Sequence, residues 1–222
     1  MRRLILLLTL STAVRAQEFN PDKSLEHATE ALRDFLNSDS PIPKDLVAKA
    51  QCVVVTPGLM KGAFLVGGKY GRGFAACRKA SGGWTAPAAI AIEGGSFGLQ
   101  IGGSSTDLIL LVMNAKGMDR LLGDKFTLGG EAAVAIGPLG GSTSANTDAT
   151  MTAEMLSYSR ARGIFAGISL EGATLRPDAG ENKKLFGKDT SNRDVLSGKI
   201  LPPRGAKPFV ALLVRHARKP KG

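Results

Sequence analysis

The stretch "CVVVTPGLMKGAFLVGGKYGRG" (residues 52–73) decides how this chain folds. It opens with a β-branched run that Pro57 and Gly58 are expected to end, and glycines then recur every few residues. β-branched residues favour extended strands, and glycine within a strand relieves crowding where a sheet coils tightly. The stretch therefore predicts short strands in a strongly curved sheet.

Similar runs of apolar residues punctuated by glycine recur along the chain, at 71–79, 84–103, 106–114, 127–137 and 162–174. Apolar residues at helical spacing predict helices at 22–37, 44–50, 115–124, 180–187 and 190–198. Evenly spaced short strands with helices at both ends predict an α+β fold, with an antiparallel, strongly curved or barrel-like β core. The polar stretch 137–151 is expected to be an exposed loop.

Residues 164–170, "IFAGISL", are apolar or small at nearly every position, which predicts a strand covered on both faces. Glu171 follows at the end of this strand. We expect its carboxylate to pair with an arginine or with backbone N–H groups, rather than to act as a general acid.

The first sixteen residues, "MRRLILLLTLSTAVRA", have the layout of a secretory signal peptide. Two arginines precede a short apolar run, and small residues precede Gln17. The run is too short to span a membrane. We expect residues 1–16 to be removed and the mature protein to be exported without a transmembrane span; an uncleaved anchor is the alternative. A helical segment at 17–47, a domain at 48–187 and a C-terminal helix with a basic tail at 188–222 would follow.

Basic charge is concentrated in two blocks that contain no acidic residue. The whole chain has a formal net charge of +10. Residues 46–92 hold six Lys/Arg and residues 195–222 hold seven, with no Asp or Glu in either block. Such clusters favour anionic partners, namely lipid headgroups, polyanions or nucleic acid. A solvated tail that aids solubility is the alternative.

Residues with the spacing of a catalytic or metal site are not found in the sequence. The two histidines, His27 and His216, lack Cys, His or carboxylate neighbours at metal-ligand spacing, and no G-x-S-x-G elbow occurs. The stretch 62–70 fails the phosphate-loop pattern, because Ala63 and Tyr70 stand at positions that require glycine and a hydroxyl. We expect no enzyme activity, cofactor or metal.

The two cysteines, Cys52 and Cys77, lie in apolar strand-like runs on either side of a glycine-rich stretch. In an oxidising compartment they could form a disulfide. Two buried free thiols fit the sequence equally well.

Ordered phrases in the domain resemble a known family. After residues 52–73 and "GGW" come "GGSFGLQIG" (94–102), "TDLILLVMN" (106–114) and "GIFAGISLEG" (163–172). Together, over about residues 48–187, they resemble the SYLF-domain family of lipid- and actin-binding proteins. The resemblance implies a binding module: eukaryotic members bind phosphoinositides, and some bind and bundle actin filaments. Secreted bacterial relatives resemble lipid-associating envelope proteins, so we expect a periplasmic or secreted protein peripherally attached to a membrane.

Anionic membrane lipids are the partner that the basic residues favour. The headgroup contacts expected from the acid-free block and the tail are Lys61, Lys69, Arg72, Arg78, Lys79, Arg215, Arg218, Lys219 and Lys221. The apolar "GLM" and "AFLV" beside Lys61 could enter the bilayer interface, and residues 209–214 could form a final strand or an amphipathic anchor. The alternative is that these strands point their basic residues in several directions.

Two other classes of partner remain open. The glycine-rich sheet could dock a protein partner in the cell envelope, as a structural or interaction module. Nucleic acid is disfavoured, because aromatic residues make up only 5% of the chain and stacking platforms are few. The helix at 22–37 holds two Lys/Arg against four Asp/Glu, so generic anionic lipid is expected rather than a phosphoinositide.

Overall fold

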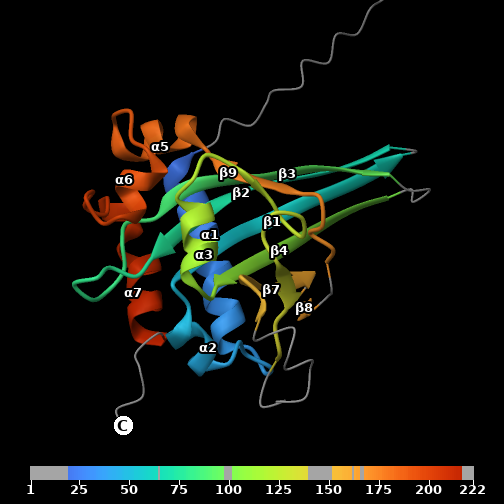
Figure 1. Ribbon diagram of the computed structural model, residues 1–222, viewed down its shortest axis with the longest axis horizontal. Coiled ribbons are helices and arrows are strands. Elements are labelled where there is room, and N and C mark those ends of the chain that lie inside the picture. The colour runs from blue at the N-terminus through green and yellow to red at the C-terminus, as the bar shows by residue number, and fades with distance from the viewer. Residues whose placement is uncertain are drawn as a thin grey trace, which may run out of the picture.

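The computed structural model shows an α+β fold built on one curled sheet (Figure 1). It describes residues 20–64, 66–97, 102–139, 152–161, 163–165 and 168–216. The strands are β1 (Cys52–Phe64), β2 (Val66–Cys77), β3 (Ala88–Phe97), β4 (Gly102–Val112), β5 (Phe126–Thr127), β6 (Val134–Ile136), β7 (Met155–Ala161), β8 (Ile164–Phe165) and β9 (Thr174–Pro177). The helices are α1 (Pro21–Asn37), α2 (Lys44–Lys49), α3 (Ala115–Leu121), α5 (Ala179–Phe186), α6 (Asn192–Leu196), η1 (Arg204–Ala206) and α7 (Lys207–His216).

The order of strands in the sheet is β5-β9-β3-β2-β1-β4-β7-β6, and β8 pairs with β7. Neighbouring strands are antiparallel except for β6, which runs parallel to β7. The sheet is therefore mixed at one edge. The predicted α+β class and the strongly curved core are confirmed.

Strand β1 does not end at Pro57 and Gly58, as expected, but continues through them as a bulge. Its register shifts between Val55 and Met60 against β2. Gly58 has a φ of +59°, which favours glycine, and its N–H donates to Asp107 Oδ1 at 2.8 Å. Across from the bulge, a Cβ on Gly73 would lie 2.1 Å from the Val55 carbonyl oxygen. β1 can therefore bulge toward β2 at this point only because residue 73 is a glycine and has no Cβ.

Each face of the sheet buries its own core. We call the first the α1 face, since helices α1 and α7 cover it and it buries Phe74 together with Phe35 and Phe209. The second is the α3 face, covered by α3, α6 and residues 168–173, and it buries Val54 and Ile90. Alternation along β2 assigns even-numbered residues to the α1 face and odd-numbered residues to the α3 face.

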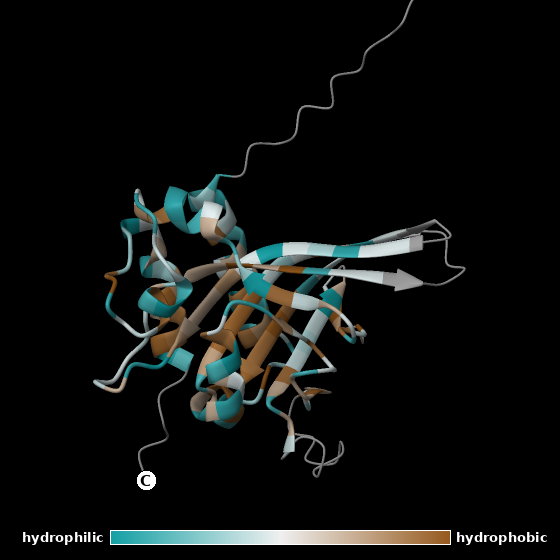
Figure 2. Cartoon of the chain, turned by 45° about the horizontal axis from the view of Figure 1, so that its top comes forward, coloured by the Kyte–Doolittle hydropathy of each residue, from teal (hydrophilic) through white to brown (hydrophobic). Residues whose placement is uncertain are grey.

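The four central strands continue past the helices as an arm (Figure 1). We define the arm as residues 60–64, 66–70, 93–97 and 102–105. Hydrophobic residues colour the strands where the helices cover them, and paler residues follow along the arm (Figure 2). β7 pairs with β4 only from Asp107 to Val112, and β9 pairs with β3 only from Ile90 to Glu93. Among the described strands, the arm is thus four strands wide.

One expectation about the C-terminal half is wrong. Among the described residues of the stretch 164–170, Ile164 and Phe165 are in a strand, and residues 168–170 form no strand. The chain turns back at Gly163 (φ +81°) to pair β8 with β7, and this strand is not covered, since Ile164 is exposed and Phe165 is partly exposed. Residues 209–214, for which the sequence left a final strand or an amphipathic anchor open, lie in helix α7.

No helix among the described residues is long and apolar enough to cross a membrane. The expected signal peptide, residues 1–16, lies outside the described residues, and so does most of the stretch 137–151 expected to be a loop.

Candidate functional site

The five basic residues expected from the acid-free block do not share one surface. On β2, Lys69 belongs to the α3 face, whereas Arg72 belongs to the α1 face. Lys61 is the cross-strand partner of Lys69 and is partly exposed. Arg78 and Lys79 follow the other end of β2, far from the arm along the strand. Because side chains alternate between the two faces of a strand, the basic residues of the acid-free block lie on different surfaces.

Lys69 is buried and bonded within the protein. Its side-chain Nζ donates to the carbonyl oxygens of Ser169 at 2.9 Å and Glu171 at 3.4 Å. Burial and then the charge of Lys61 lower the pKa of Lys69, against a smaller opposing effect of Glu171. Lys69 therefore ties residues 169–171 to the sheet. Glu171 takes part through its backbone carbonyl, while its carboxylate is exposed.

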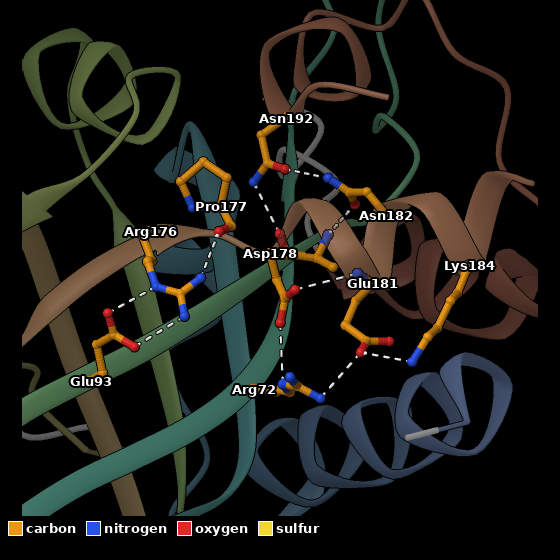
Figure 3. A network of polar contacts seen from close by, with 10 residues as sticks. Arg72, Glu93, Arg176, Pro177, Asp178, Glu181, Asn182, Lys184 and Asn192 are labelled. Atoms are coloured by element: carbon orange, nitrogen blue, oxygen red, sulfur yellow. Dashed lines mark hydrogen bonds and ion pairs between the residues drawn. The ribbon is translucent and has the colours of Figure 1, made fainter. Parts of the chain in front are cut away.

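Arg72 holds helix α5 against the sheet (Figure 3). Its Nε lies 3.1 Å from Asp178 Oδ2, and its Nη1 donates to Glu181 Oε1 at 3.1 Å. The Asp178 side chain also accepts from the N–H of Glu181 and so caps α5. The two carboxylates are 10% and 5% exposed, and Lys184 reaches Glu181 at 3.3 Å. Arg72 thus compensates two nearly buried negative charges.

Two asparagines extend the same network to α6 (Figure 3). Asn182 Oδ1 accepts from the N–H of Ala89 at 2.8 Å, and Asn192 Nδ2 donates to the Ala89 carbonyl oxygen at 3.1 Å. The amide of Asn182 also donates to Asn192 Oδ1. Sequence reasoning missed both residues, since nothing in the sequence marks a helix asparagine that completes a strand's hydrogen bonds.

The Arg78 side chain binds the carbonyl groups at the C-terminal end of helix α2. Its Nε donates to the Ala50 carbonyl oxygen and its Nη2 to the Ala48 carbonyl oxygen, both at 2.8 Å. The guanidinium also lies over the Trp84 ring, 4.7 Å from the centroid, and burial lowers the pKa of Arg78. Lys79, the next residue, is exposed. Of the five basic residues, three therefore bind groups of the protein itself.

Cys52 and Cys77 form a disulfide in the structure, with an S–S distance of 2.05 Å. They are cross-strand partners in the register of β1 and β2, and both are fully buried.

The C-terminal helices carry an excess of basic over acidic residues. Residues 179–216 hold eight Lys/Arg and three Asp/Glu, which leaves a formal net charge of +5. The basic residues of this helical end are Lys183, Lys184, Lys188, Arg193, Lys199, Arg204, Lys207 and Arg215, and all eight are exposed. α5, α6 and α7 lie together at the end of the molecule opposite the arm (Figure 1).

Of the expected tail residues, Arg215 lies on α7 within this helical end. Arg218, Lys219 and Lys221 lie outside the described residues. The basic residues of 183–193 were missed from the sequence because Asp189 and Asp194 interrupt the run.

Two cavities of the described part adjoin each other and are lined largely by apolar side chains. One, of about 390 Å³, is lined by Val134, Ile136, Ile168 and Leu170 together with Gly129, Ser157, Ser169 and Glu171. A second of about 150 Å³ shares Ile136, Ser157 and Ile168 with it. In the described residues, no group of three or more His, Cys, Asp or Glu side chains is placed to hold a metal ion.

Comparison with known proteins identifies relatives over most of the chain. The family model described as "Ysc84: Las17-binding protein actin regulator" matches residues 93–216. The "SH3 domain-containing YSC84-like protein 1" of Rattus norvegicus is 33% identical over 207 residues, which are 90% of this chain and 61% of that protein. The Xenopus laevis protein of the same name is 36% identical over 183 residues, 82% of this chain and 54% of the relative.

A yeast relative points to the same family. The "LAS seventeen-binding protein 3" of Saccharomyces cerevisiae is 32% identical over 184 residues, 81% of this chain and 40% of the relative. The chain therefore spans between two fifths and about three fifths of the length of these three proteins. With a family model matched over more than half its length, and with these relatives, the chain belongs to the Ysc84 family, also called the SYLF-domain family.

Proposed function

We propose that this protein is a non-catalytic binding module that attaches to anionic lipid surfaces through its helical end. One observation carries the proposal: residues 179–216 have a net charge of +5, and all eight of their basic residues are exposed. Helix α7 buries Phe209 and Leu213 in the core of the α1 face, while Lys207 and Arg215 stay in solvent. Folding therefore presents the charge to a partner.

The expected contacts from the sequence change accordingly. Lys61, Lys79 and Arg215 are available for headgroups, whereas Lys69, Arg72 and Arg78 have partners within the protein. Each basic side chain near an anionic membrane contributes roughly 1 kcal/mol. We also propose, from residues 1–16, that the mature protein is exported and attaches peripherally in the cell envelope.

Replacing Arg204 and Lys207 with alanine together should weaken vesicle binding by about 2 kcal/mol, or about thirtyfold. Both residues are exposed at the start of α7, where a positive charge does not favour the helix, so the fold should be retained. Purified residues 17–222 would be titrated with phosphatidylcholine vesicles containing phosphatidylglycerol, at about 0.1 M and about 0.5 M salt, where screening differs strongly.

The matched control removes two exposed basic residues elsewhere, in the variant Arg33→Ala/Lys125→Ala. It changes the net charge equally and should bind within about threefold of the unchanged protein, since long-range charge effects are screened. Equal losses in both variants would show that only total charge matters. Equal binding to neutral and anionic vesicles would reject lipid attachment through charge.

A second candidate is a protein-interaction module that acts on the actin cytoskeleton or its regulators. It is favoured by the comparisons, because the matching family model is described as a Las17-binding actin regulator and the yeast relative is named for Las17 binding. Co-sedimentation with actin filaments tests it directly. Pelleting with filaments at about 0.5 M salt, combined with failure to pellet with anionic vesicles, would favour this function over the lipid function.

A further inference from the structure

The α1 face of the sheet continues past the helices without a cover among the described residues. Along β2, Tyr70, Arg72 and Phe74 alternate onto this face. Phe74 is buried under α1, and Arg72 binds α5. Tyr70, one step further along the same face, is 43% exposed. The cover therefore ends between Arg72 and Tyr70, where the arm begins.

Two large side chains stand on this uncovered face. Met60 on β1 is the cross-strand partner of Tyr70, and it is 65% exposed. Methionine and tyrosine are side chains that proteins use at contact surfaces, because methionine adapts its shape and tyrosine joins an apolar ring to a polar end. An adjacent exposed pair of this kind marks a contact surface more than a lone apolar residue does.

The row beyond this pair carries no side chains. Four glycines lie in register across the arm, one on each strand: Gly103, Gly62, Gly68 and Gly95. All four are exposed, and a Cβ on Gly62 or Gly95 would meet nothing within 4 Å. Met60 and Tyr70 therefore stand at the border of a flat strip of backbone, with no neighbouring side chain beyond them to cover them.

The charge and composition of the arm indicate what it contacts. Its only acidic residue is Glu93, which Arg176 holds through two hydrogen bonds at 2.8 and 3.0 Å. The other charged residues of the arm are basic, Lys61 and Lys69; they lie on the α3 face, where Lys61 is partly exposed and Lys69 is bonded to residues 169 and 171. In the sequence, β1 ends on Phe64, β2 begins on Val66 and β3 ends on Phe97, so apolar residue types stand at three of the four strand ends.

We propose that the arm is a second lipid contact and enters the interface of an anionic bilayer, with Met60 and Tyr70 at the boundary of headgroups and acyl chains. The proposal rests on the lipid attachment argued above. Exposed Met60 and Tyr70 beside a bare strip of backbone, with their one acidic neighbour, Glu93, neutralised by Arg176, match an interface in which apolar groups dip about 5–10 Å below anionic headgroups. Helices α5 and α7 lie on the same side of the sheet, so one membrane can meet both surfaces.

The experiment places a fluorophore on the arm. Tryptophan is introduced as Met60→Trp, and Ile136→Trp is the matched control, because Ile136 is 68% exposed and lines the cavities of the α3 side. The native Trp84 is buried and contributes equally to both. Vesicles contain phosphatidylglycerol and a lipid brominated on its acyl chain. We expect bromine to quench the added emission of Met60→Trp and to leave that of Ile136→Trp unchanged.

A loss variant gives an independent measurement. Met60→Ser/Tyr70→Ser should bind anionic vesicles about tenfold more weakly, since apolar burial is lost. Its salt dependence should equal that of the unchanged protein, because no charge is removed. Ile136→Ser/Ile164→Ser, which removes two exposed apolar side chains away from the arm, should bind normally.

Each outcome decides between the two surfaces. If the protein binds vesicles but Met60→Trp is not quenched, the arm proposal is overturned and the lipid function stands. If no variant binds vesicles, the lipid function fails and the arm proposal fails with it. If the serine pair binds vesicles normally but no longer pellets with actin filaments, the arm contacts a protein, and bilayer entry is refuted.

Discussion

Replacing Arg72 with alanine should destabilise the fold by about 3–5 kcal/mol, the range seen when one partner of a buried ion pair is removed. The free energy of unfolding falls because two carboxylates would remain nearly buried without their basic partner. Asp178 and Glu181, at 10% and 5% exposure, would keep their negative charges without the guanidinium between them. Lys184 contacts Glu181 alone, so it compensates only part of the loss. Urea unfolding of the purified domain measures the change as a lower midpoint.

Two variants test whether the cost is electrostatic. Lys79→Ala removes an exposed basic residue seven positions on, and it should change the free energy of unfolding by less than about 0.5 kcal/mol. Adding Glu181→Gln to Arg72→Ala should restore part of the stability, because a buried carboxylate becomes a neutral amide. Unchanged stability of Arg72→Ala, together with weaker vesicle binding, would return Arg72 to the lipid-contacting residues.

Local patterns predicted the elements of this fold well. The helix expected at 22–37 is α1, which Asn20 caps through its side chain, and the glycine-punctuated runs of 71–79 and 106–114 lie in β2 and β4 or directly continue them. These elements follow from the spacing of apolar residues and from β-branched content, which the sequence displays directly. The family resemblance was carried by the same runs, and the comparisons confirm it.

The expected site was less accessible to sequence reasoning, because its charges are balanced by distant residues. No acid lies within twenty residues of Arg72 in the sequence, yet folding brings Asp178 and Glu181 to it across more than one hundred residues. Lys69 likewise meets the carbonyl of Ser169, one hundred residues away. A run without acids therefore does not predict a basic surface, since β9 and α5 pack beside it only in three dimensions.

The helical end illustrates the opposite case. Asp189 and Asp194 make residues 183–194 look mixed in charge, although each aspartate forms an exposed ion pair with a lysine of the same region. Exposed pairs contribute little and leave the surrounding surface basic. Helix α7 was equally ambiguous, since an apolar run of six residues suits a strand or a helix, and only its packing against α1 decides between them.

Reduction of the Cys52–Cys77 disulfide should cost about 3.5 kcal/mol, because the bond closes a loop with a sequence separation of 25 and removes that freedom from the unfolded chain. For a chain of this size, such a loss lowers the melting temperature by about 10 °C. Both sulfurs are fully buried between β1 and β2, so the native protein should react with a thiol probe only after unfolding in the presence of reductant.

Thermal melts with and without a phosphine reductant measure this shift. The control is Cys52→Ala/Cys77→Ala, whose melting temperature should be lowered and should not respond to the reductant. Two thiols that react on unfolding without reductant would show that the cysteines are free, and the predicted shift would then be absent. A formed disulfide would match the export proposed from residues 1–16, since such bonds persist in oxidising compartments. The number of thiols that react without reductant therefore also tests the proposed export, because a disulfide is expected in an oxidising compartment.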